Sequence, residues 1–296
     1  MGEIGEAPAV LPSSFSIPTN ALAGLALGAL VSLGPACDSP DAEPDAKPVA
    51  KTEVEPDAKP AAKPNSAEST PAQAKPEPMA QRHTPLFPEL QTYLSGLEGE
   101  LDGLPAERRE LLDLLAKHVV ARRGADQPAR LLFICTHNSR RSHMGQLWAA
   151  TAAAFYGVDG IETFSGGTEA TAFNPRAVAA MTRAGFTIDS DNDGAEQNPR
   201  YSVRMGEGVE PMLAFSKTWE DESNPKEGFA AVMTCSQADA ACPFVRGAAL
   251  RVALPYDDPK AADDTPEEAG RYDERARQIA TEMLYLFRAV SRAQAS

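Results

Sequence analysis

Regular spacing of apolar and polar positions begins near Leu86 and continues to the end of this 296-residue chain. Apolar residues three and four positions apart predict two short amphipathic helices over 89–97 and 106–122. A Gly-Leu-Pro sequence separates them, because glycine and proline interrupt helices. We expect this helical pair, within residues 85–126, to be an accessory cap or packing element and not a site.

From residue 127 to 296, short apolar runs alternate with amphipathic stretches. The predicted elements, in chain order, are a strand over 130–135, a helix over 142–155, a strand over 161–165, a helix over 175–184, strands over 229–235 and 250–254, and a helix over 266–291. This alternation favours an α/β fold with an open, mainly parallel four-stranded sheet and helices on both faces.

The last predicted helix has a clear start signal and one apolar face. Thr265 is the expected N-cap, Pro266 takes the first helical position, and Glu268 closes a capping box. The apolar positions step by four and three, which indicates a helix packed on the sheet: Tyr272, Ala276, Ile279, Met283, Leu286 and Val290.

The composition changes sharply near His83. Residues 38–84 are rich in Pro, Ala, Lys and Glu and contain a near-repeat that starts at Glu43 and again at Glu55. Such a segment buries too little apolar surface to offset the entropy of ordering it. It is therefore predicted to be a disordered linker.

An apolar run over 21–33 precedes the linker. It is too short to span a bilayer comfortably, but it fits the apolar core of a signal peptide. Small residues before Cys37 resemble a bacterial lipoprotein cleavage site, which would lipidate Cys37 and tether the chain to a membrane. Residues 1–20 contain no Lys or Arg, and Gly34 stands where a larger aliphatic residue is usual, so the alternative for 1–37 is an extension with an inert cysteine.

The candidate chemistry lies where the strand over 130–135 ends. Cys135-Thr-His-Asn-Ser-Arg-Arg141-Ser142 joins this apolar strand to a helix, an arrangement whose backbone N–H groups can bind a tetrahedral oxyanion. Arg141 can hold two anion oxygens, and the same positive field stabilises the Cys135 thiolate, the form that attacks. We expect Ser142 to hydrogen-bond the sulfur. The predicted oxyanion-binding residues are Thr136, His137, Asn138, Ser139, Arg140, Arg141 and Ser142.

Two further cysteines follow another apolar run. Cys235 comes at the end of a predicted parallel strand, at the sheet edge where ligands bind, so it is placed to face Cys135. A helix between Cys235 and Cys242 would separate their α-carbons by about 10.5 Å, whereas a disulfide needs about 4.4–6.8 Å. The pair is either a redox switch that unwinds this segment or two structural thiols. No Cys or His spacing is typical of zinc, so no metal is expected.

Together these residues resemble the low-molecular-weight protein tyrosine phosphatase superfamily and, within it, the thioredoxin-coupled arsenate reductases. The resemblance covers about residues 129 to 292. It is carried by the loop from Cys135, the cysteine pair, the Ser165-Gly-Gly turn followed by Asn174-Pro175, and the Asp258-Pro259 sequence. It implies that Asp258 is the general acid and that Asn138 holds the turn of the loop, as Asn tolerates left-handed backbone.

The resemblance also implies a reaction. Cys135 attacks arsenate, Cys235 attacks the adduct and releases arsenite, and Cys242 takes over the disulfide, which thioredoxin or a similar thiol reductant then reduces. No bound cofactor is implied. Two alternatives stay open: a phosphatase acting on phosphotyrosine or aryl phosphates through a phosphocysteine, and a tethered module that binds oxyanions without turnover.

The sequence departs from the family pattern in three places. His137 and Arg140 stand where the loop commonly has Gly and Cys. The tyrosines that often follow the Asp-Pro of the phosphatases are absent, which argues against phosphotyrosine as substrate. The run from Cys135 to Cys235 is long, with extra residues around 189–222.

The overall charge limits the partners. With 42 acidic and 28 basic residues, the net charge is −14, which argues against nucleic-acid binding. We expect a monomer. Thiol cycling favours a reducing, cytoplasmic location, whereas a genuine lipoprotein segment would anchor the protein in the cell envelope.

Overall fold

The computed structural model describes residues 85–190 and 197–295. The predicted segment 1–37, with Cys37, and the predicted linker 38–84 lie outside the described residues. Among the described helices, none is both long and apolar enough to cross a membrane.

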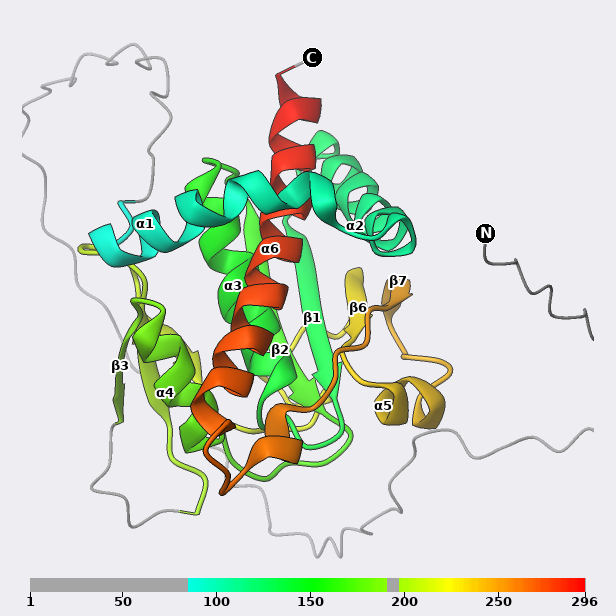
Figure 1. The fold of residues 1–296 in the computed structure, drawn as a ribbon. Helices are drawn as coiled ribbons and strands as arrows, with labels where there is room; N and C mark the ends of the chain where they lie inside the picture. The colour runs from blue at the N-terminus through cyan, green and yellow to red at the C-terminus, as the bar shows by residue number, and fades with distance from the viewer. Residues whose placement is uncertain (1–84, 191–196, 296) are drawn as a thin grey trace, which may run out of the picture. The chain divides into compact units, whose positions relative to one another are not determined.

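A four-stranded parallel sheet forms the centre of the molecule, as predicted (Figure 1). Its order is β2 (Ile161–Gly167), β1 (Ala129–Cys135), β6 (Phe229–Met233) and β7 (Ala248–Ala253), and each neighbouring pair is parallel. The two central strands are almost wholly buried, which explains why they read as continuous apolar runs instead of an alternating pattern.

Successive residues of β1 enter different hydrophobic clusters, because side chains alternate between the faces of a sheet. Leu131 and Phe133 join the larger cluster with α3 (Arg141–Phe155) and α6 (Glu268–Gln294), which pack against each other (Figure 1). Leu132 and Ile134 join a smaller cluster on the opposite face. That cluster includes residues of α5 (Ser236–Ala241) and all three described cysteines. The sheet therefore has helices on both faces.

The helical segment at the start of the described chain packs on the α/β unit. It consists of α1 (Pro88–Leu97), the 3-10 helix η1 (Glu98–Gly103) and α2 (Ala106–Gly124), close to the predicted bounds. Leucines on one face of α1 and α2 are fully buried in the same cluster as α3 and α6: Leu90, Leu94, Leu97, Leu112 and Leu115. The helical segment and the sheet thus share one core.

A second, antiparallel sheet was not predicted. It contains β3 (Thr187–Ser190), β4 (Tyr201–Arg204) and β5 (Met212–Ala214), in that order, inside the region of extra residues. These strands have only three or four residues each and are partly exposed, so they carry no clear alternation. The remaining helices are α4 (Pro175–Arg183) and the 3-10 helix η2 (Pro259–Ala262).

Several predicted boundaries were wrong. β2 extends to Gly167 instead of 165, and β7 spans Ala248–Ala253 instead of 250–254. β6 ends at Met233 instead of 235, and Cys235 is the N-cap of α5. α6 begins at Glu268 instead of 266, and Glu267 takes the N-cap position in place of the predicted Thr265. The Glu268 carboxylate accepts from the Asp264 N–H at 2.7 Å, so it does not bond the N–H of the predicted cap, Thr265.

Candidate active site

The loop after β1 is fixed by Asn138. Its backbone has φ 43°, the left-handed conformation expected for this residue. Its side-chain oxygen accepts from the Lys217 N–H at 2.9 Å, and its side-chain nitrogen donates to Ser142 Oγ at 2.8 Å. Because the Lys217 N–H can only donate, the Asn138 side-chain atom that faces it must be the oxygen, and the atom that faces Ser142 must be the nitrogen.

The carbonyl groups of the loop point away from its centre. The carbonyls of Thr136, His137 and Ser139 accept hydrogen bonds from segments outside the loop. The donors belong to Thr168, Glu169, Thr171, Asn174 and Ser216. Within the described ranges, no acceptor pairs with the N–H groups of residues 137–140. These N–H groups are therefore available to an anion, as in other anion-binding turns.

Cys135, the last residue of β1, is a free thiol and only 3% exposed. Its sulfur lies 3.1 Å from Ser142 Oγ, the contact expected from the sequence. Ser142 Oγ also accepts from the Asn138 amide, and either Cys135 Sγ or Ser142 Oγ can be the donor in their contact. When the sulfur is a thiolate it can only accept, so Ser142 is then the donor.

Arg141 connects the loop to the segment after β7. Its Nη1 donates to the Tyr256 carbonyl at 2.9 Å, and its Nη2 donates to Asp258 Oδ2 at 2.8 Å. Its Nε is buried and has no hydrogen-bond partner in the described part of the chain. Asp258 also accepts from the Lys260 N–H at 3.1 Å and caps η2. The predicted nucleophile loop, arginine and acid are thus brought together.

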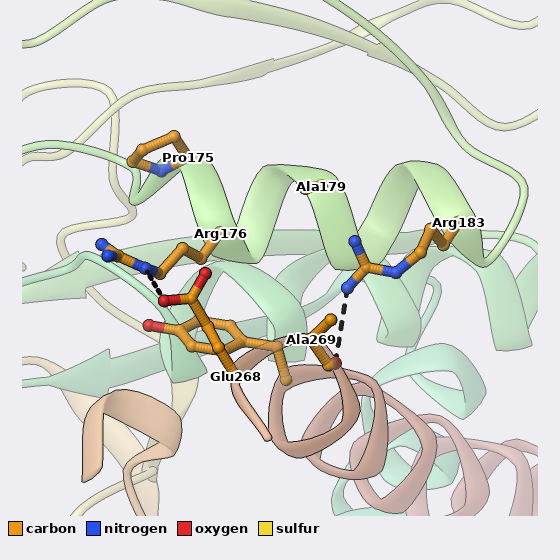
Figure 2. Close-up of a pocket in the computed structure, with 7 residues that line it drawn as sticks. Pro175, Arg176, Ala179, Arg183, Glu268 and Ala269 are labelled. Atoms are coloured by element: carbon orange, nitrogen blue, oxygen red, sulfur yellow. Dashed lines mark hydrogen bonds and ion pairs between the residues drawn. The ribbon is translucent and has the colours of Figure 1, made fainter. Parts of the chain in front are cut away.

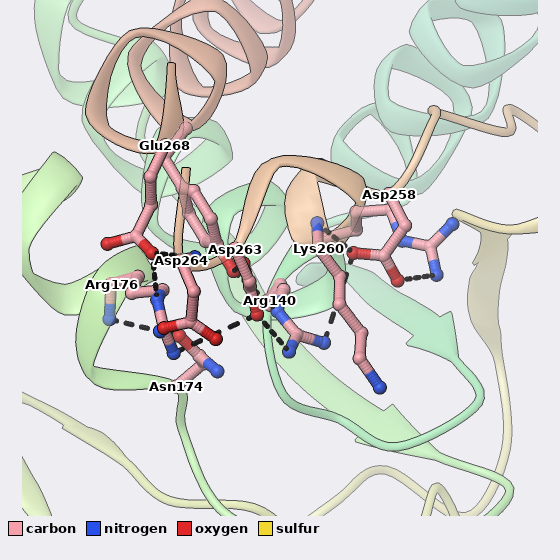
Figure 3. Close-up of polar contacts among 10 residues, drawn as sticks. Arg140, Asn174, Arg176, Asp258, Lys260, Asp263, Asp264 and Glu268 are labelled. Carbon is pink, nitrogen blue, oxygen red and sulfur yellow. Dashed lines mark hydrogen bonds and ion pairs between the residues drawn. The ribbon is translucent and has the colours of Figure 1, made fainter. Parts of the chain in front are cut away.

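The side chain of Arg140 is paired with groups outside the loop, whereas its backbone N–H belongs to the loop. Its side chain turns toward carboxylates and not toward the centre of the loop (Figure 3). Arg140 Nε donates to the Tyr272 hydroxyl at 2.8 Å, and its Nη atoms lie 3.9 Å from Asp258 Oδ1 and 3.7 Å from Asp263 Oδ2. These partners lie more than a hundred residues along the chain, so the loop sequence alone gave no sign of them.

His137 is a partly exposed residue of the loop. Its side chain is half exposed, and its Nε2 lies 3.7 Å from Glu169.

Sequence reasoning missed two buried basic residues near the loop. Burial, with a contribution from the Lys217 charge, lowers the pKa of His143 to about 3, so this ring is neutral and stacks on Phe173. Burial also lowers the pKa of Lys217 to about 8, and its amine lies 4.6 Å from the centre of the Phe215 ring. No motif marks Lys217, because it is placed by backbone contacts with distant residues, Gly167 at the end of β2 and Asn138 in the loop.

Cys235 lies beside the loop, as expected. Its sulfur is 3.4 Å from Thr136 Oγ1 and accepts from the Ala238 N–H at 3.3 Å. Cys242 is buried at the other end of α5, so a helix does separate the pair. Arg251 of β7 donates to the Cys242 carbonyl at 3.1 Å and to the Asp239 side chain. No cluster of potential metal ligands occurs among the described residues.

An arsenate reductase from Halalkalibacterium halodurans is 31% identical to this chain over 138 residues, which cover 47% of this chain and 79% of that protein. The chain belongs to the low-molecular-weight protein tyrosine phosphatase superfamily, with arsenate reductases among its relatives. An arsenate reductase from Bacillus subtilis is 29% identical over 147 residues, covering 50% of this chain and 86% of that protein. No protein-family model matches the chain.

Two solved structures also show a likeness to this chain. A low-molecular-weight phosphotyrosine phosphatase from Vibrio cholerae O395 is 15% identical, with a TM-score of 0.35 over 56% of this chain and 95% of that one. The YwlE arginine phosphatase from Geobacillus stearothermophilus is 16% identical, with a TM-score of 0.35 over 57% and 96% of the two chains.

A pocket of about 220 Å³ lies between α4 and α6 (Figure 2). Its two arginines are already paired: Arg176 with Glu268 at 2.6 Å, and Arg183 with Asp273 at 2.6 Å. Tyr272, which supports Arg140, forms part of its wall.

Proposed function

We propose that this protein is an arsenate reductase that uses Cys135 as nucleophile and Cys235 and Cys242 as a disulfide relay. The observation that supports this best is the position of the second cysteine. Cys235 Sγ lies 3.4 Å from Oγ1 of Thr136, which is a residue of the anion-binding loop. Cys235 also shares a buried cluster with Cys135. A phosphatase reaction has no use for a second thiol at that place, whereas a two-electron reduction requires one.

The first step uses the loop and the acid. The free N–H groups and Arg141 hold arsenate, and the Cys135 thiolate forms a sulfur–arsenic bond. Asp258 protonates the oxygen that leaves as water. The 2.8 Å contact between Arg141 and Asp258 keeps the acid and the anion-binding group together.

The second step reduces the arsenic. The Cys235 thiolate attacks Cys135 Sγ, a disulfide forms, and the electron pair of the sulfur–arsenic bond leaves with arsenite. The Cys242 thiolate then attacks Cys235, which returns Cys135 to a thiolate and leaves the disulfide between Cys235 and Cys242. A thioredoxin-like dithiol reduces that disulfide, so two electrons enter for each arsenate reduced.

The test uses the purified protein with thioredoxin, thioredoxin reductase and NADPH. We expect arsenate-dependent loss of NADPH that disappears in Cys242→Ser. That variant should still release one arsenite per protein in a single turnover, because its first two thiols are intact. No NADPH loss in the parent protein and no single-turnover arsenite would refute the reductase.

A phosphatase is the second candidate, because Cys135, Arg141 and Asp258 form a complete set without the cysteine pair. It predicts hydrolysis of an aryl phosphate through a phosphocysteine. Cys235→Ser separates the two candidates: loss of arsenate reduction with hydrolysis retained supports the reductase, whereas hydrolysis without any arsenate reduction in the parent protein supports the phosphatase.

A further inference from the structure

One residue of the accessory helix α2 reaches the segment that carries the proposed acid. Arg108, in the first turn of α2, donates through Nη1 to the Pro255 carbonyl at 3.0 Å. Its guanidinium also lies 4.9 Å from the centre of the Tyr256 ring. Pro255 and Tyr256 directly precede Asp257 and Asp258, so a helix outside the α/β unit contacts the chain just before the active-site aspartate.

Arg108 is held in that position by a buried carboxylate. Its Nε and Nη2 donate to the two oxygens of Glu282 at 2.9 and 2.6 Å, which is a bidentate pair. The Tyr256 hydroxyl donates to the same carboxylate at 2.7 Å, and Glu282 is only 1% exposed. Burial, followed by the charge of Glu282, raises the pKa of Tyr256 well above its ordinary value, so the phenol keeps the proton that it donates.

Tyr256 links the Arg108–Glu282 pair to Arg141, the arginine proposed to bind the anion. While its side chain is fixed by Arg108 and Glu282, its carbonyl accepts from Arg141 Nη1 at 2.9 Å. The other terminal nitrogen of Arg141 holds Asp258 at 2.8 Å. A continuous chain of contacts therefore joins α2 to Arg141 and Asp258, the two side chains proposed to act on the oxyanion.

We propose that Arg108 is a positioning residue of the active site: together with Glu282 it fixes Tyr256, whose carbonyl orients Arg141 toward the oxyanion and beside Asp258. The accessory helices are then a working part of the site. This inference rests on the proposed function for its kinetic consequence, but its consequence for anion binding does not depend on turnover.

The perturbation is Arg108→Met. Because this change leaves the buried Glu282 without its ionic partner, which is strongly destabilising, the double variant Arg108→Met with Glu282→Gln is tested beside it. The amide that replaces the carboxylate in the double variant still offers an acceptor to Tyr256. Arg288→Met is the matched control, since Arg288 pairs with Asp102 of η1 at 2.8 Å and ties the same helices to α6 without touching the segment before Asp258.

The first readout is the Kd for inorganic phosphate, measured by calorimetry on the full chain. We expect the Kd to rise about tenfold in both Arg108 variants, equivalent to about 1.4 kcal/mol, and to stay unchanged in Arg288→Met. The second readout is kcat/KM for arsenate, with an expected fall of about 10- to 100-fold. The fall in kcat/KM caused by Arg108→Met should be smaller when Asp258→Asn is already present. The effect of Arg108 acts through Asp258, and the effects of coupled residues are not additive.

The outcomes separate the two proposals. A parent protein that binds phosphate but does not reduce arsenate refutes the proposed function and leaves the phosphate readout to decide on Arg108. Phosphate Kd values that are equal in the Arg108 variants and in Arg288→Met overturn the inference. A parent protein that does not bind phosphate overturns it as well, because Arg141 would then have no anion to be oriented toward.

Discussion

The hydrogen bond from Ser142 to the Cys135 sulfur gives the sharpest test of the site. Ser142→Ala removes a fully buried hydroxyl 3.1 Å from the sulfur. A thiolate sulfur can only accept, so Ser142 is the donor to it in that state, and the variant removes this donor.

Two effects of the change can be estimated separately. A hydrogen bond to a charged group contributes about 1.5–3 kcal/mol, so at a fixed pH the population of the thiolate falls at least about tenfold. The variant also leaves the Asn138 Nδ2 without an acceptor, and a buried unsatisfied donor costs about 1–3 kcal/mol of folding stability. We therefore expect lower reactivity and a lower free energy of unfolding together.

The assay is the rate of Cys135 alkylation by iodoacetamide at neutral pH, followed by mass spectrometry in a Cys235→Ser, Cys242→Ser background. Thr151→Ala is the control, because it removes another buried hydroxyl of α3 that donates to the Leu147 carbonyl at 2.8 Å. We expect alkylation to slow about tenfold in Ser142→Ala and to stay unchanged in Thr151→Ala. Equal alkylation rates in the two variants would refute the argument that Ser142 stabilises the thiolate.

Other changes have distinct expected outcomes. In Gly167→Ala the new Cβ would lie 2.3 Å from the Glu169 carbonyl oxygen, so we expect loss of phosphate binding and a stability loss of at least about 1 kcal/mol; Gly99→Ala, with no atom within 4 Å, should show neither in calorimetry and denaturation. The folded pKa of Lys217, about 8 against an ordinary 10.5, means that the unfolded chain binds more protons between these values. The free energy of unfolding should therefore gain from this residue as pH rises from about 8 to 10.5, and this gain should disappear in Lys217→Met; an identical pH dependence of the two proteins would contradict it. Arg140→Met should lower kcat/KM for arsenate while the phosphate Kd changes less than twofold, since its side chain contacts Asp258 and not the loop centre; a large rise in Kd would show the opposite.

The sequence was most informative where pattern and chemistry coincided. The run from β1 through the loop into α3 is marked by a buried strand, a nucleophile and an arginine, so both the element bounds and the Ser142 contact could be anticipated. The positive φ of Asn138 followed from the tolerance of Asn for left-handed backbone. These features depend on residues that are close in sequence.

The features that escaped prediction depend on distant residues. The partners of the Arg140 side chain, Tyr272 and Asp263, lie more than a hundred residues along the chain and have no local signal in the sequence. Lys217 lies beside the loop because its backbone pairs with Gly167 and Asn138, which are 50 and 79 positions away in the sequence. The contact of Arg108 with Pro255 spans 147 positions, and no local pattern encodes it.

The helix α5 links the proposed redox chemistry to conformational stability. Its caps are the two cysteines of the relay, so a disulfide between Cys235 and Cys242 cannot form while α5 is intact. Each increment of helix stability therefore favours the dithiol form and makes the pair a stronger oxidant. Ala240→Gly, which weakens a helix by about 1 kcal/mol, should lower the reduction potential by about 20 mV. If the proposed relay operates, the stability of these six helical residues contributes directly to the reduction potential of the cysteine pair.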